Sequence, residues 1–273
     1  MALLVFTTLA SSIVAGGRST PIVTASLAVL AVTLGSAGAN VLTSYLDRDI
    51  DAVMNRTKLR PIPSRRIYPP EKALLYGLSL AALSITISYI ISPLVVALMV
   101  FGLADNIIIY SRILKRRNPI SIVLGGFSGG VPAAIGFFAV PQVSKSWIIG
   151  LVLASLVVLW IPTHIWSLAL RVREDYARAK IPMLPVVVSE KIAVRCIGST
   201  SVLMVFFTLL PSVTEAFGAL YLVTAVVFGG IMLALNLWLI ARPSKAKAWT
   251  VFKFSSPYLA LMFLAMAIDS IAL

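Results

Sequence analysis

Long stretches without a charged side chain are the feature that most limits what this chain can fold into. Eight stretches contain no Asp, Glu, Lys or Arg: 1–17, 19–46, 73–104, 118–144, 146–170, 196–214, 216–241 and 254–268. Most of them reach the roughly 20 residues needed to cross a bilayer core. The stretch at 73–104 is too long for one span and is interrupted at Ser92-Pro93, which predicts two helices joined by a tight turn. The chain is therefore expected to cross a membrane nine times.

The expected fold is an all-α polytopic membrane protein with a single membrane domain over residues 1–273. The nine helices are expected at 1–17, 21–46, 73–91, 94–112, 120–139, 146–170, 192–211, 217–241 and 253–272. A hydrophobic share of 59% with only 12% charged residues agrees with this class and leaves too little polar chain for a soluble domain. The first helix lacks a charged leader, so it is interpreted as a retained span, and whether Met1 is the true start stays open.

The distribution of basic residues predicts the orientation in the membrane. Of the 23 Lys and Arg residues, 21 lie in the even-numbered connections between helices, and only Arg18 and Lys145 lie in the odd-numbered ones. Basic loops are retained on the cytoplasmic side, so the even connections are expected to be cytoplasmic and the C-terminus outside the cell membrane. The net charge of +13 is thus assigned to topology and membrane lipid rather than to a nucleic-acid partner.

Carboxylates join the basic residues in two of these loops, where topology does not need them. The first group, Asp47-Arg48-Asp49-Ile50-Asp51, continues from the second helix and places Asp47 and Asp51 at i and i+4, on one helix face. Asn40 and Ser44 extend the same face into the membrane. One or two carboxylates that leave room for water and phosphate oxygens are typical of Mg²⁺ sites.

Basic segments that accompany these acids indicate a diphosphate ligand. A proline-stiffened segment follows the first acidic group and contains Arg56, Lys58 and Arg60. A second basic segment, with Lys115 and Arg116, closes the fourth helix on the same side. Carboxylate-bound Mg²⁺ together with Arg and Lys is suited to hold a diphosphate and to neutralise it as it leaves.

A second acidic group follows the sixth helix, four spans after the first group. It contains Glu174 and Asp175, and Tyr176 comes next. The recurrence suggests two four-helix halves plus a ninth helix, each half supplying one acidic helix end to a shared cleft. Tyr110 and Tyr176 are candidates to contact the diphosphate or to shield a cation, although interfacial tyrosines are common.

Polar residues inside the spans are further candidates. Asp105 is expected either to face a cavity or to be neutral and bonded to a neighbouring helix. His164, the single histidine, is interpreted either as an acceptor-site residue or as a hydrogen-bonded packing residue. Trp160 is expected to pack or to lie in an aromatic belt.

With these residues in view, the chain resembles the UbiA-type intramembrane prenyltransferases, and within that superfamily the heme O synthases. The segments that carry the resemblance are 45–58 (YLDRDIDAVMNRTK), 60–64, 114–117 (LKRR), 125–136 (GGFSGGVPAAIG), 160–170 (WIPTHIWSLAL) and 174–186 (EDYARAKIPMLPV). The sequence departs from the wider superfamily at Thr43-Ser44, where Asn-Asp is usual, and at Arg171, where an acid is usual.

The resemblance implies a nine-helix bundle with a central cavity open to the cytoplasmic side and laterally to lipid. It implies Mg²⁺ bound by Asp47, Asp51 and Asp175 with Glu174, and diphosphate contacts from Arg56 and Lys115. The expected reaction is transfer of a polyprenyl group from an isoprenoid diphosphate to an acceptor. Further substrate contacts are expected from Asn40, Ser44, Lys58, Arg60, Asp105, Tyr110, Arg116, His164 and Tyr176.

The acceptor is the point that the residues alone leave open. The resemblance points to farnesylation of heme B (protoheme IX) to heme O, in which His164 would either ligate the heme iron or position the porphyrin. The alternatives are 4-hydroxybenzoate, another aromatic, or a geranylgeranylglyceryl phosphate lipid as acceptor. A membrane transporter is the alternative outside the enzymes, because transporters also carry intramembrane polar residues and internal repeats.

Overall fold

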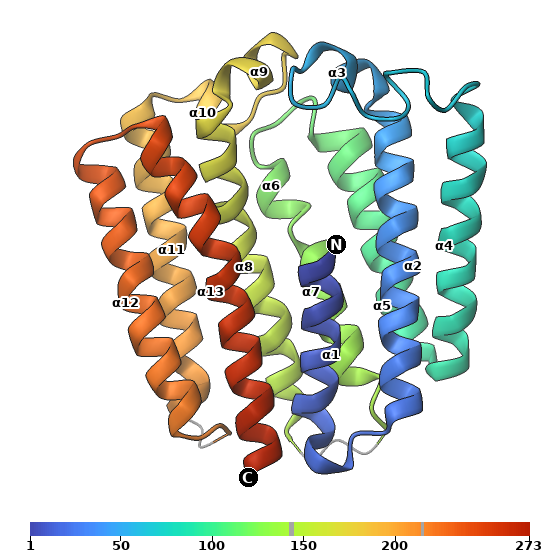
Figure 1. Ribbon diagram of the computed structural model, residues 1–273, viewed down its shortest axis with the longest axis vertical. Coiled ribbons are helices and arrows are strands. Elements are labelled where there is room, and N and C mark those ends of the chain that lie inside the picture. The colour runs from blue at the N-terminus through green and yellow to red at the C-terminus, as the bar shows by residue number, and fades with distance from the viewer. Residues whose placement is uncertain (142–144, 214–215) are drawn as a thin grey trace.

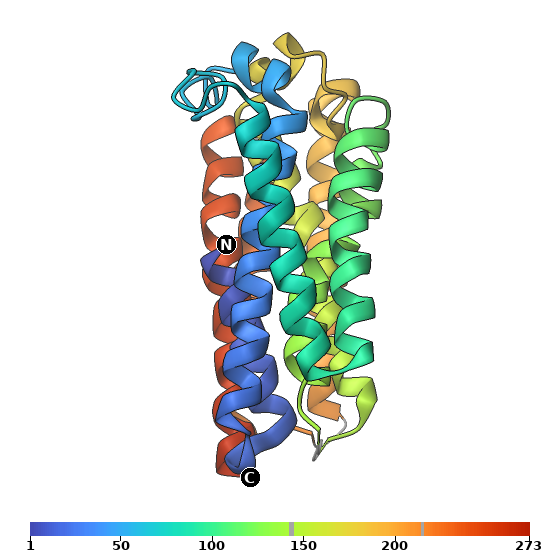
Figure 2. The same cartoon turned by 90° about the vertical axis from the view of Figure 1, so that its right-hand side faces the viewer.

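The computed structural model of the chain describes residues 1–141, 145–213 and 216–273. In these ranges, nine helices are long and apolar enough to cross a membrane, which confirms the number of spans predicted from the sequence. They stand side by side along one common direction (Figures 1 and 2). The protein is an all-helical integral membrane protein.

The helices follow one another along the chain, and 54–70 is the longest connection between them. They are α1 (Ala2–Gly16), η1 (Gly17–Ser19), α2 (Ile22–Leu46), α3 (Arg48–Val53), α4 (Glu71–Ile91), α5 (Pro93–Ala104), η2 (Asp105–Leu114), α6 (Ser121–Leu124), α7 (Phe127–Phe138), α8 (Trp147–Arg171), α9 (Arg173–Arg178), α10 (Leu184–Val187), α11 (Glu190–Val213), α12 (Ala219–Ala241) and α13 (Lys245–Ala272). Of these, η1 is a 3₁₀ turn and η2 is a π-helix.

The long helices form a closed ring in chain order. Each contacts the next along the sequence α1, α2, α4, α5, α7, α8, α11, α12 and α13, and α13 returns to contact α1. Contacts of α1 with α7 and of α8 with α13 cross the interior of the ring. The second and sixth spans, α2 and α8, are each followed directly by a short helix, α3 and α9, which therefore occupy corresponding places in the two halves.

Helix boundaries differ from the sequence-based prediction in three places. The expected helix 94–112 consists of α5 and the π-helix η2, and the expected helix 120–139 is divided into α6 and α7 around Gly125 and Gly126. The last helix begins at Lys245 rather than at 253, because the Ser244 side chain caps it by accepting from the Lys247 N–H at 3.2 Å. Lysine and alanine favour helix, so this first turn is helical although it is charged.

The expected break between the third and fourth spans is confirmed at Ser92. The Ser92 Oγ accepts a hydrogen bond from the Val95 N–H at 3.2 Å, and Pro93 occupies the first turn of α5. A serine cap followed by proline is a strong helix-start signal, because proline needs no backbone donor there.

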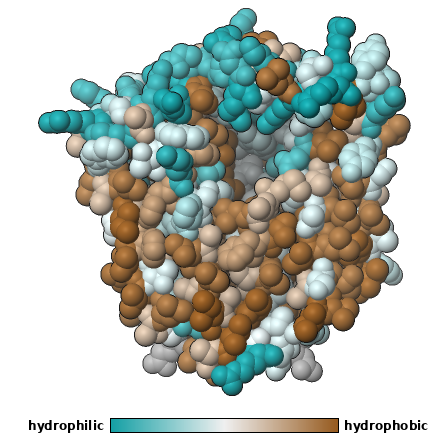
Figure 3. Space-filling view, viewed as in Figure 1, coloured by the Kyte–Doolittle hydropathy of each residue, from teal (hydrophilic) through white to brown (hydrophobic). Residues whose placement is uncertain are grey.

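Charged residues collect at one end of the bundle, which we call the basic end. It comprises α3, α9 and α10 with the segments 54–70, 115–120 and 242–244 (Figure 1). Figure 3 shows this end as a hydrophilic band above an apolar girdle, with a hollow just above the N-terminal end of α1. The hollow leads from this face toward the interior, beneath the basic end.

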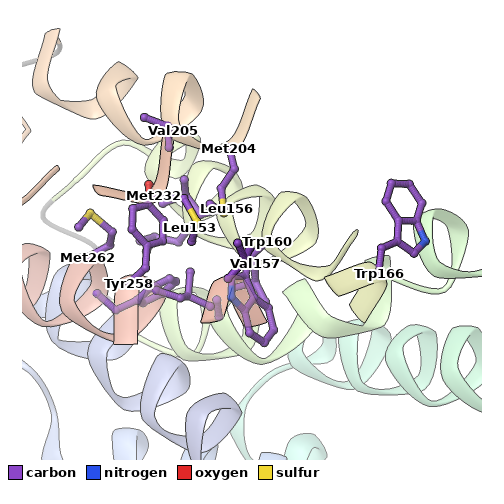
Figure 4. Close-up of a cluster of buried hydrophobic side chains, with 14 of the residues drawn as sticks. Leu153, Leu156, Val157, Trp160, Trp166, Met204, Val205, Met232, Tyr258 and Met262 are labelled. Atoms are coloured by element: carbon purple, nitrogen blue, oxygen red, sulfur yellow. The ribbon is translucent and has the colours of Figure 1, made fainter. Parts of the chain in front are cut away.

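The apolar core is centred on α8. Figure 4 shows its side chains meeting those of α11, α12 and α13; the labelled residues of this cluster are Leu153, Leu156, Val157, Trp160, Met204, Val205, Met232, Tyr258 and Met262. Trp166 lies apart from them, further along α8. The same buried cluster also includes Ile50 and Met54 from the first acidic segment and Tyr176 from α9. Apolar burial therefore fixes both short helices to the bundle.

Close approach of α2 to α4 depends on Gly38. A Cβ atom at Gly38 would lie 2.9 Å from the Ala81 nitrogen and 3.0 Å from the Gly77 oxygen, both backbone atoms. Small residues allow helices to pack closely in a membrane, where dispersion rather than the hydrophobic effect drives their association.

We expect Gly38→Leu to separate α2 from α4 and to lower the free energy of unfolding by more than the ~1–3 kcal/mol typical of overpacking. Gly230→Leu is the matched control, since a Cβ there meets no atom within 4 Å. Unfolding of both variants in detergent, followed by circular dichroism, measures the difference. Equal stability of the two variants would contradict the packing role of Gly38.

Candidate active site

The two acidic segments lie together at the basic end. One is α3 with the residues that follow it, and the other is α9. The Arg56 N–H donates a hydrogen bond to Oδ2 of Asp175 at 3.2 Å and so joins positions 119 residues apart. Asp175 also accepts from Nη1 of Arg178 at 3.3 Å. A single substrate can therefore contact both segments.

Asp47 and Asp51 share a buried face, as their spacing predicts. Each is 3% exposed, whereas Asp49 between them is exposed. The helix bends at Asp47, between α2 and α3. The backbone N–H of Asp51 still donates a hydrogen bond to the backbone carbonyl oxygen of Asp47 at 2.8 Å. The bond keeps the two carboxylates one turn apart on the inner side of the segment.

Each buried carboxylate is paired with a cation from a neighbouring loop. Oδ2 of Asp47 forms a salt bridge with Nζ of Lys115, and Oδ2 of Asp51 pairs with Nη1 of Arg60 at 2.8 Å. Only 16% of the Lys115 side chain is exposed. Low exposure weakens solvent screening, so removal of one partner leaves a costly buried charge.

Two other ion pairs lie on the surface. Arg116 holds both carboxylate oxygens of Asp49 at 2.7 Å, and this contact lowers the pKa of Asp49. Lys245 of α13 holds Glu174 at 2.5 Å, and that bond lowers the pKa of Glu174. The Glu174 side chain is 64% exposed, so the structure does not bring it to the buried carboxylates with which it was expected to bind metal.

The donor set at the basic end fits a metal ion that shares its ligands with a substrate. Oδ1 of Asp47 is buried and has no hydrogen-bond partner, which leaves a hard oxygen ligand free. Across the described part of the chain, no three Asp, Glu, His or Cys side chains gather closely enough to form a protein cage. Mg²⁺ commonly takes one or two carboxylates and completes its shell with water and phosphate oxygens.

Two tyrosines, Tyr110 and Tyr176, lie near the basic residues of this site. Tyr110 belongs to the π-helix η2. At the end of this helix, the backbone N–H of Lys115 donates a hydrogen bond to the backbone carbonyl oxygen of Tyr110 at 2.8 Å. Nζ of Lys115 lies 5.7 Å from the centre of the Tyr110 ring. Burial raises the pKa of the Tyr176 hydroxyl and Tyr110 adds to the rise, whereas Arg56 and Lys115 oppose it. The two tyrosines, Arg56 and Lys115 thus form one interacting group.

A cavity of about 430 Å³ extends from Tyr110 into the membrane part of the bundle. Its walls come from α1, η2, α6, α7, α8 and α13 and include Leu4, Asn106, Gly126, Trp160, His164 and Ile165. A smaller cavity of about 110 Å³ shares Leu4, Asn106, Ser128 and Gly129 with it and continues between α2 and α5. The combined space is mostly apolar and begins next to the carboxylate cluster.

Four of the predicted site residues lie outside the carboxylate cluster. Asn40 lines the smaller cavity, and Ser44 is half-buried on α2 between Asn40 and the acidic segment. Lys58 is exposed and bonds to Asn55 Oδ1 at 3.2 Å. Asp105 is buried, and its Oδ2 accepts from the Ser128 N–H at 2.8 Å, which is the bond to a neighbouring helix that was the alternative for this residue.

His164 lies in the wall of the larger cavity, held by α8 and α13. Its ring stacks on Trp160 with 4.2 Å between centroids and on Phe252 with 4.3 Å. Nδ1 of His164 lies 2.7 Å from the side-chain Oγ of Ser255. The indole N–H of Trp160 donates a hydrogen bond to the backbone carbonyl oxygen of Ser255 at 2.8 Å. Trp160 and His164, one turn apart on α8, therefore both form hydrogen bonds with Ser255 of α13.

The sequence-based prediction missed Ser255 and Phe252 and assigned Trp160 only to packing or to an aromatic belt. The i, i+4 spacing of Trp160 and His164 places them on one face of α8, and this was the available signal. Nothing in the sequence of α13 marks Ser255, because serine is common in membrane helices and its partner lies 91 residues away.

Sequence comparisons find relatives that match most of the chain. The sequence model described as the UbiA prenyltransferase family matches residues 4–266. The chain is 46% identical over 270 residues to a protoheme IX farnesyltransferase of Desulforudis audaxviator, with 98% of this chain and 84% of that protein covered. It is 42% identical over 285 residues to protoheme IX farnesyltransferase 2 of Cenarchaeum symbiosum, with 98% and 91% covered.

Solved structures share the fold at low sequence identity. A digeranylgeranylglyceryl phosphate synthase superimposes with a TM-score of 0.83 at 21% identity, covering 99% of this chain and 94% of that one. A UbiA homologue from Archaeoglobus fulgidus bound to GPP and Mg²⁺ gives a TM-score of 0.64 at 17% identity, covering 100% and 96%.

We expect Lys115→Met to lower the free energy of unfolding by ~3–5 kcal/mol, because it leaves Asp47 buried and unpaired. Arg116→Met removes an exposed pair and should cost no more than ~1 kcal/mol. Equilibrium unfolding in mixed detergent measures both variants. Adding Asp47→Asn to Lys115→Met should recover part of the loss; equal losses for the two single variants would rule out the buried pair as the stronger one.

Proposed function

The chain belongs to the UbiA prenyltransferase family, and we propose that it transfers a farnesyl group from farnesyl diphosphate to protoheme IX to give heme O. The observation that carries the proposal is its similarity to protoheme IX farnesyltransferases over 98% of the chain. The geometry supports it, because a cluster of acids and bases lies directly above an apolar cavity. The comparisons do not favour a transporter.

The diphosphate is proposed to bind at the basic end. Mg²⁺ would be held there by Asp47, Asp51 and Asp175 and would withdraw charge from the diphosphate. The buried salt bridges keep these charges balanced when no substrate is bound. On binding, Lys115 and Arg60 would turn from the carboxylates to the diphosphate oxygens, and the carboxylates would become free to hold the metal.

Charge neutralisation is the proposed source of catalysis. Lys115, Arg60 and Arg56 would stabilise the negative charge that develops on the leaving diphosphate as the allylic C–O bond breaks. The prenyl carbon then becomes electron-poor and would be attacked by a vinyl carbon of protoheme IX. The cation left on that vinyl group would take up water and release a proton, which gives the hydroxyl group of heme O. Tyr110 lies beside Lys115 and lines the cavity, and Tyr176 is buried near Tyr110, Arg56 and Lys115. The two rings would shield the developing cation from water.

The cavity is proposed to receive the two apolar substrates. Each CH₂ group that leaves water contributes ~0.8 kcal/mol, so a long prenyl tail binds well in such a space. Asn40 and Asn106 supply polar contacts in the smaller cavity. His164 lies in the wall of the larger cavity and is proposed to contact the acceptor.

The orientation proposed for the protein places the basic end in the cytoplasm. Nearly all of the lysine and arginine in the loops is at this end, as the positive-inside rule requires of cytoplasmic loops. With nine spans in the described ranges, the C-terminus would then lie on the outer side of the cell membrane.

We expect Asp47→Asn and Asp175→Asn each to lower kcat by about 10²–10³, the loss typical of removing one preorganised electrostatic contact. Glu71→Gln is the control, because Glu71 is an exposed acid at the start of α4 outside the cluster. Release of diphosphate from farnesyl diphosphate, with Mg²⁺ and acceptor present, is the measurement. Unchanged turnover in both Asp variants would refute their proposed roles.

The acceptor is tested by offering the purified protein farnesyl diphosphate with either heme B or 4-hydroxybenzoate. We expect a farnesylated heme product by mass spectrometry and no prenylated phenol, because the relatives that match most of the chain are protoheme IX farnesyltransferases. Prenylation of the phenol without any heme product would overturn the proposed acceptor while retaining prenyl transfer.

A further inference from the structure

The larger and the smaller cavity of the site meet at a junction that carries two polar side chains. Leu4, Asn106, Ser128 and Gly129 line both cavities. Leu4 is apolar and Gly129 has no side chain, so the polar groups that these shared residues supply are the Asn106 amide and the Ser128 hydroxyl. The junction is therefore a polar point in a space whose walls are mostly apolar.

The π-helix η2 places Asn106 at this junction. Asn106 and Tyr110 both belong to η2, lie about one turn apart and line the larger cavity. Lys115 comes directly after η2, so Asn106 lies about one turn farther along the helix from that cation than Tyr110 does. Short π-helical segments are frequent at functional sites, and here the segment brings an amide into the cavity below the basic end.

The Asn106 side chain has hydrogen-bonding capacity that the protein does not use. Its amide offers two N–H donors and one acceptor oxygen. Across residues 1–141, 145–213 and 216–273, no hydrogen bond joins these atoms to another residue. The side chain is only half-buried, so its polar atoms are open to a molecule in the cavity.

Ser128 supplies the second polar group. Its backbone N–H donates to Oδ2 of Asp105 at 2.8 Å, which holds α7 beside η2 at the junction. Its hydroxyl donates to the backbone oxygen of Gly125 at 2.7 Å, so Oγ keeps the capacity to accept. A water molecule inside a protein needs two to four polar partners and roughly 10–15 Å³, and the smaller cavity alone offers about 110 Å³.

The proposed reaction needs water at one place and must exclude it from another. Water that met the prenyl cation beside the diphosphate would hydrolyse it. The cation formed afterwards on the vinyl group has to meet water, because heme O carries a hydroxyl group there. A water molecule held within the cavity, but one helical turn deeper than Tyr110, satisfies both requirements.

We infer that Asn106 and Ser128 hold the water molecule that becomes the hydroxyl group of heme O. The inference rests on the proposed function, which supplies heme and farnesyl diphosphate as substrates. The water oxygen forms a bond to the electron-poor carbon of the former vinyl group, and the proton that the water loses passes to the diphosphate. Each turnover thus consumes one farnesyl diphosphate, one heme and one water, and it yields heme O and diphosphate.

The experiment measures the composition of the product rather than its amount. The full-length protein in lipid nanodiscs receives farnesyl diphosphate, Mg²⁺ and heme B in water labelled with heavy oxygen. The products are separated by chromatography before mass spectrometry, so that water lost in the spectrometer is not counted. We expect the wild type to form the hydroxylated product with the label in its hydroxyl group.

In Asn106→Leu, the vinyl cation should lose a proton instead and give an alkene that is lighter by one water molecule. The ratio of hydroxylated product to alkene should fall by about 10-fold or more, as expected when one well-placed hydrogen bond to the water is lost. The smaller Asn106→Val should show the same fall. Asn106→Ser retains a polar group and should recover most of the hydroxylated product.

Asn236→Leu is the matched control. Asn236 is a buried asparagine of α12 whose amide donates to the Met232 backbone oxygen at 2.9 Å, and it lines neither cavity. This variant should keep the wild-type ratio. Because the ratio is taken among molecules that have been turned over, a smaller amount of folded protein does not change it.

A wild-type ratio in Asn106→Leu or Asn106→Val would overturn the inference, as would an equal fall in Asn236→Leu or a hydroxyl group without the label. Loss of all turnover in both apolar variants of Asn106 would also overturn it, because Asn106 would then act in binding or ionisation. These results leave the proposed function intact when the wild type farnesylates heme. Absence of any farnesylated heme from the wild type would overturn the proposed acceptor and the inference together.

Discussion

Charged side chains cannot be placed in hydrocarbon without a cost of ~3 kcal/mol or more, and this constraint organises the whole molecule. It gathers the basic residues at one end and brings the acids of α3 and α9 into contact there. Two acids inside the spans accept hydrogen bonds from backbone donors. Asp105 accepts from the Ser128 N–H at 2.8 Å, and Asp269 accepts from the Tyr221 N–H at 2.9 Å.

The site lies where this polar end meets the apolar interior. Buried salt bridges at Asp47 and Asp51 hold charge in a place with little solvent, and the cavity below them is almost without charge. Tyr110 belongs to both regions, because it lies beside Lys115 and also lines the cavity. Ionisation of a prenyl diphosphate gives a diphosphate anion and a cation on an apolar chain. The anion is stabilised on the polar side of this boundary, and the prenyl chain is held on its apolar side.

The sequence was sufficient for the number of spans, the break at Ser92 and the convergence of two acidic segments, because each follows from local patterns of charge and hydrophobicity. The π-helix over Asp105–Leu114 was not predictable, since its hydrogen bonds depend on packing rather than on residue type. The salt bridge between Asp47 and Lys115 joins residues 68 positions apart, and the hydrogen bond between His164 and Ser255 joins residues 91 positions apart. The sequence places charged segments at the same end of the bundle, but it does not specify which individual side chains pair. Glu174 shows that neighbours in the sequence can also separate. It precedes Asp175, yet its side chain lies on the surface and pairs with Lys245, away from the buried carboxylates.

Closure of the ring by α13 has a consequence for biosynthesis. Ribosomes deliver the helices in order, and α13 follows the other helices of the described ranges, yet it supplies both Phe252 and Ser255 to the histidine on α8. A nascent chain with eight inserted helices would carry the complete acidic cluster but an unfinished histidine pocket. Translation therefore separates the assembly of these two parts of the bundle in time, because the histidine pocket is completed only when α13 packs against α8 and closes the ring on α1.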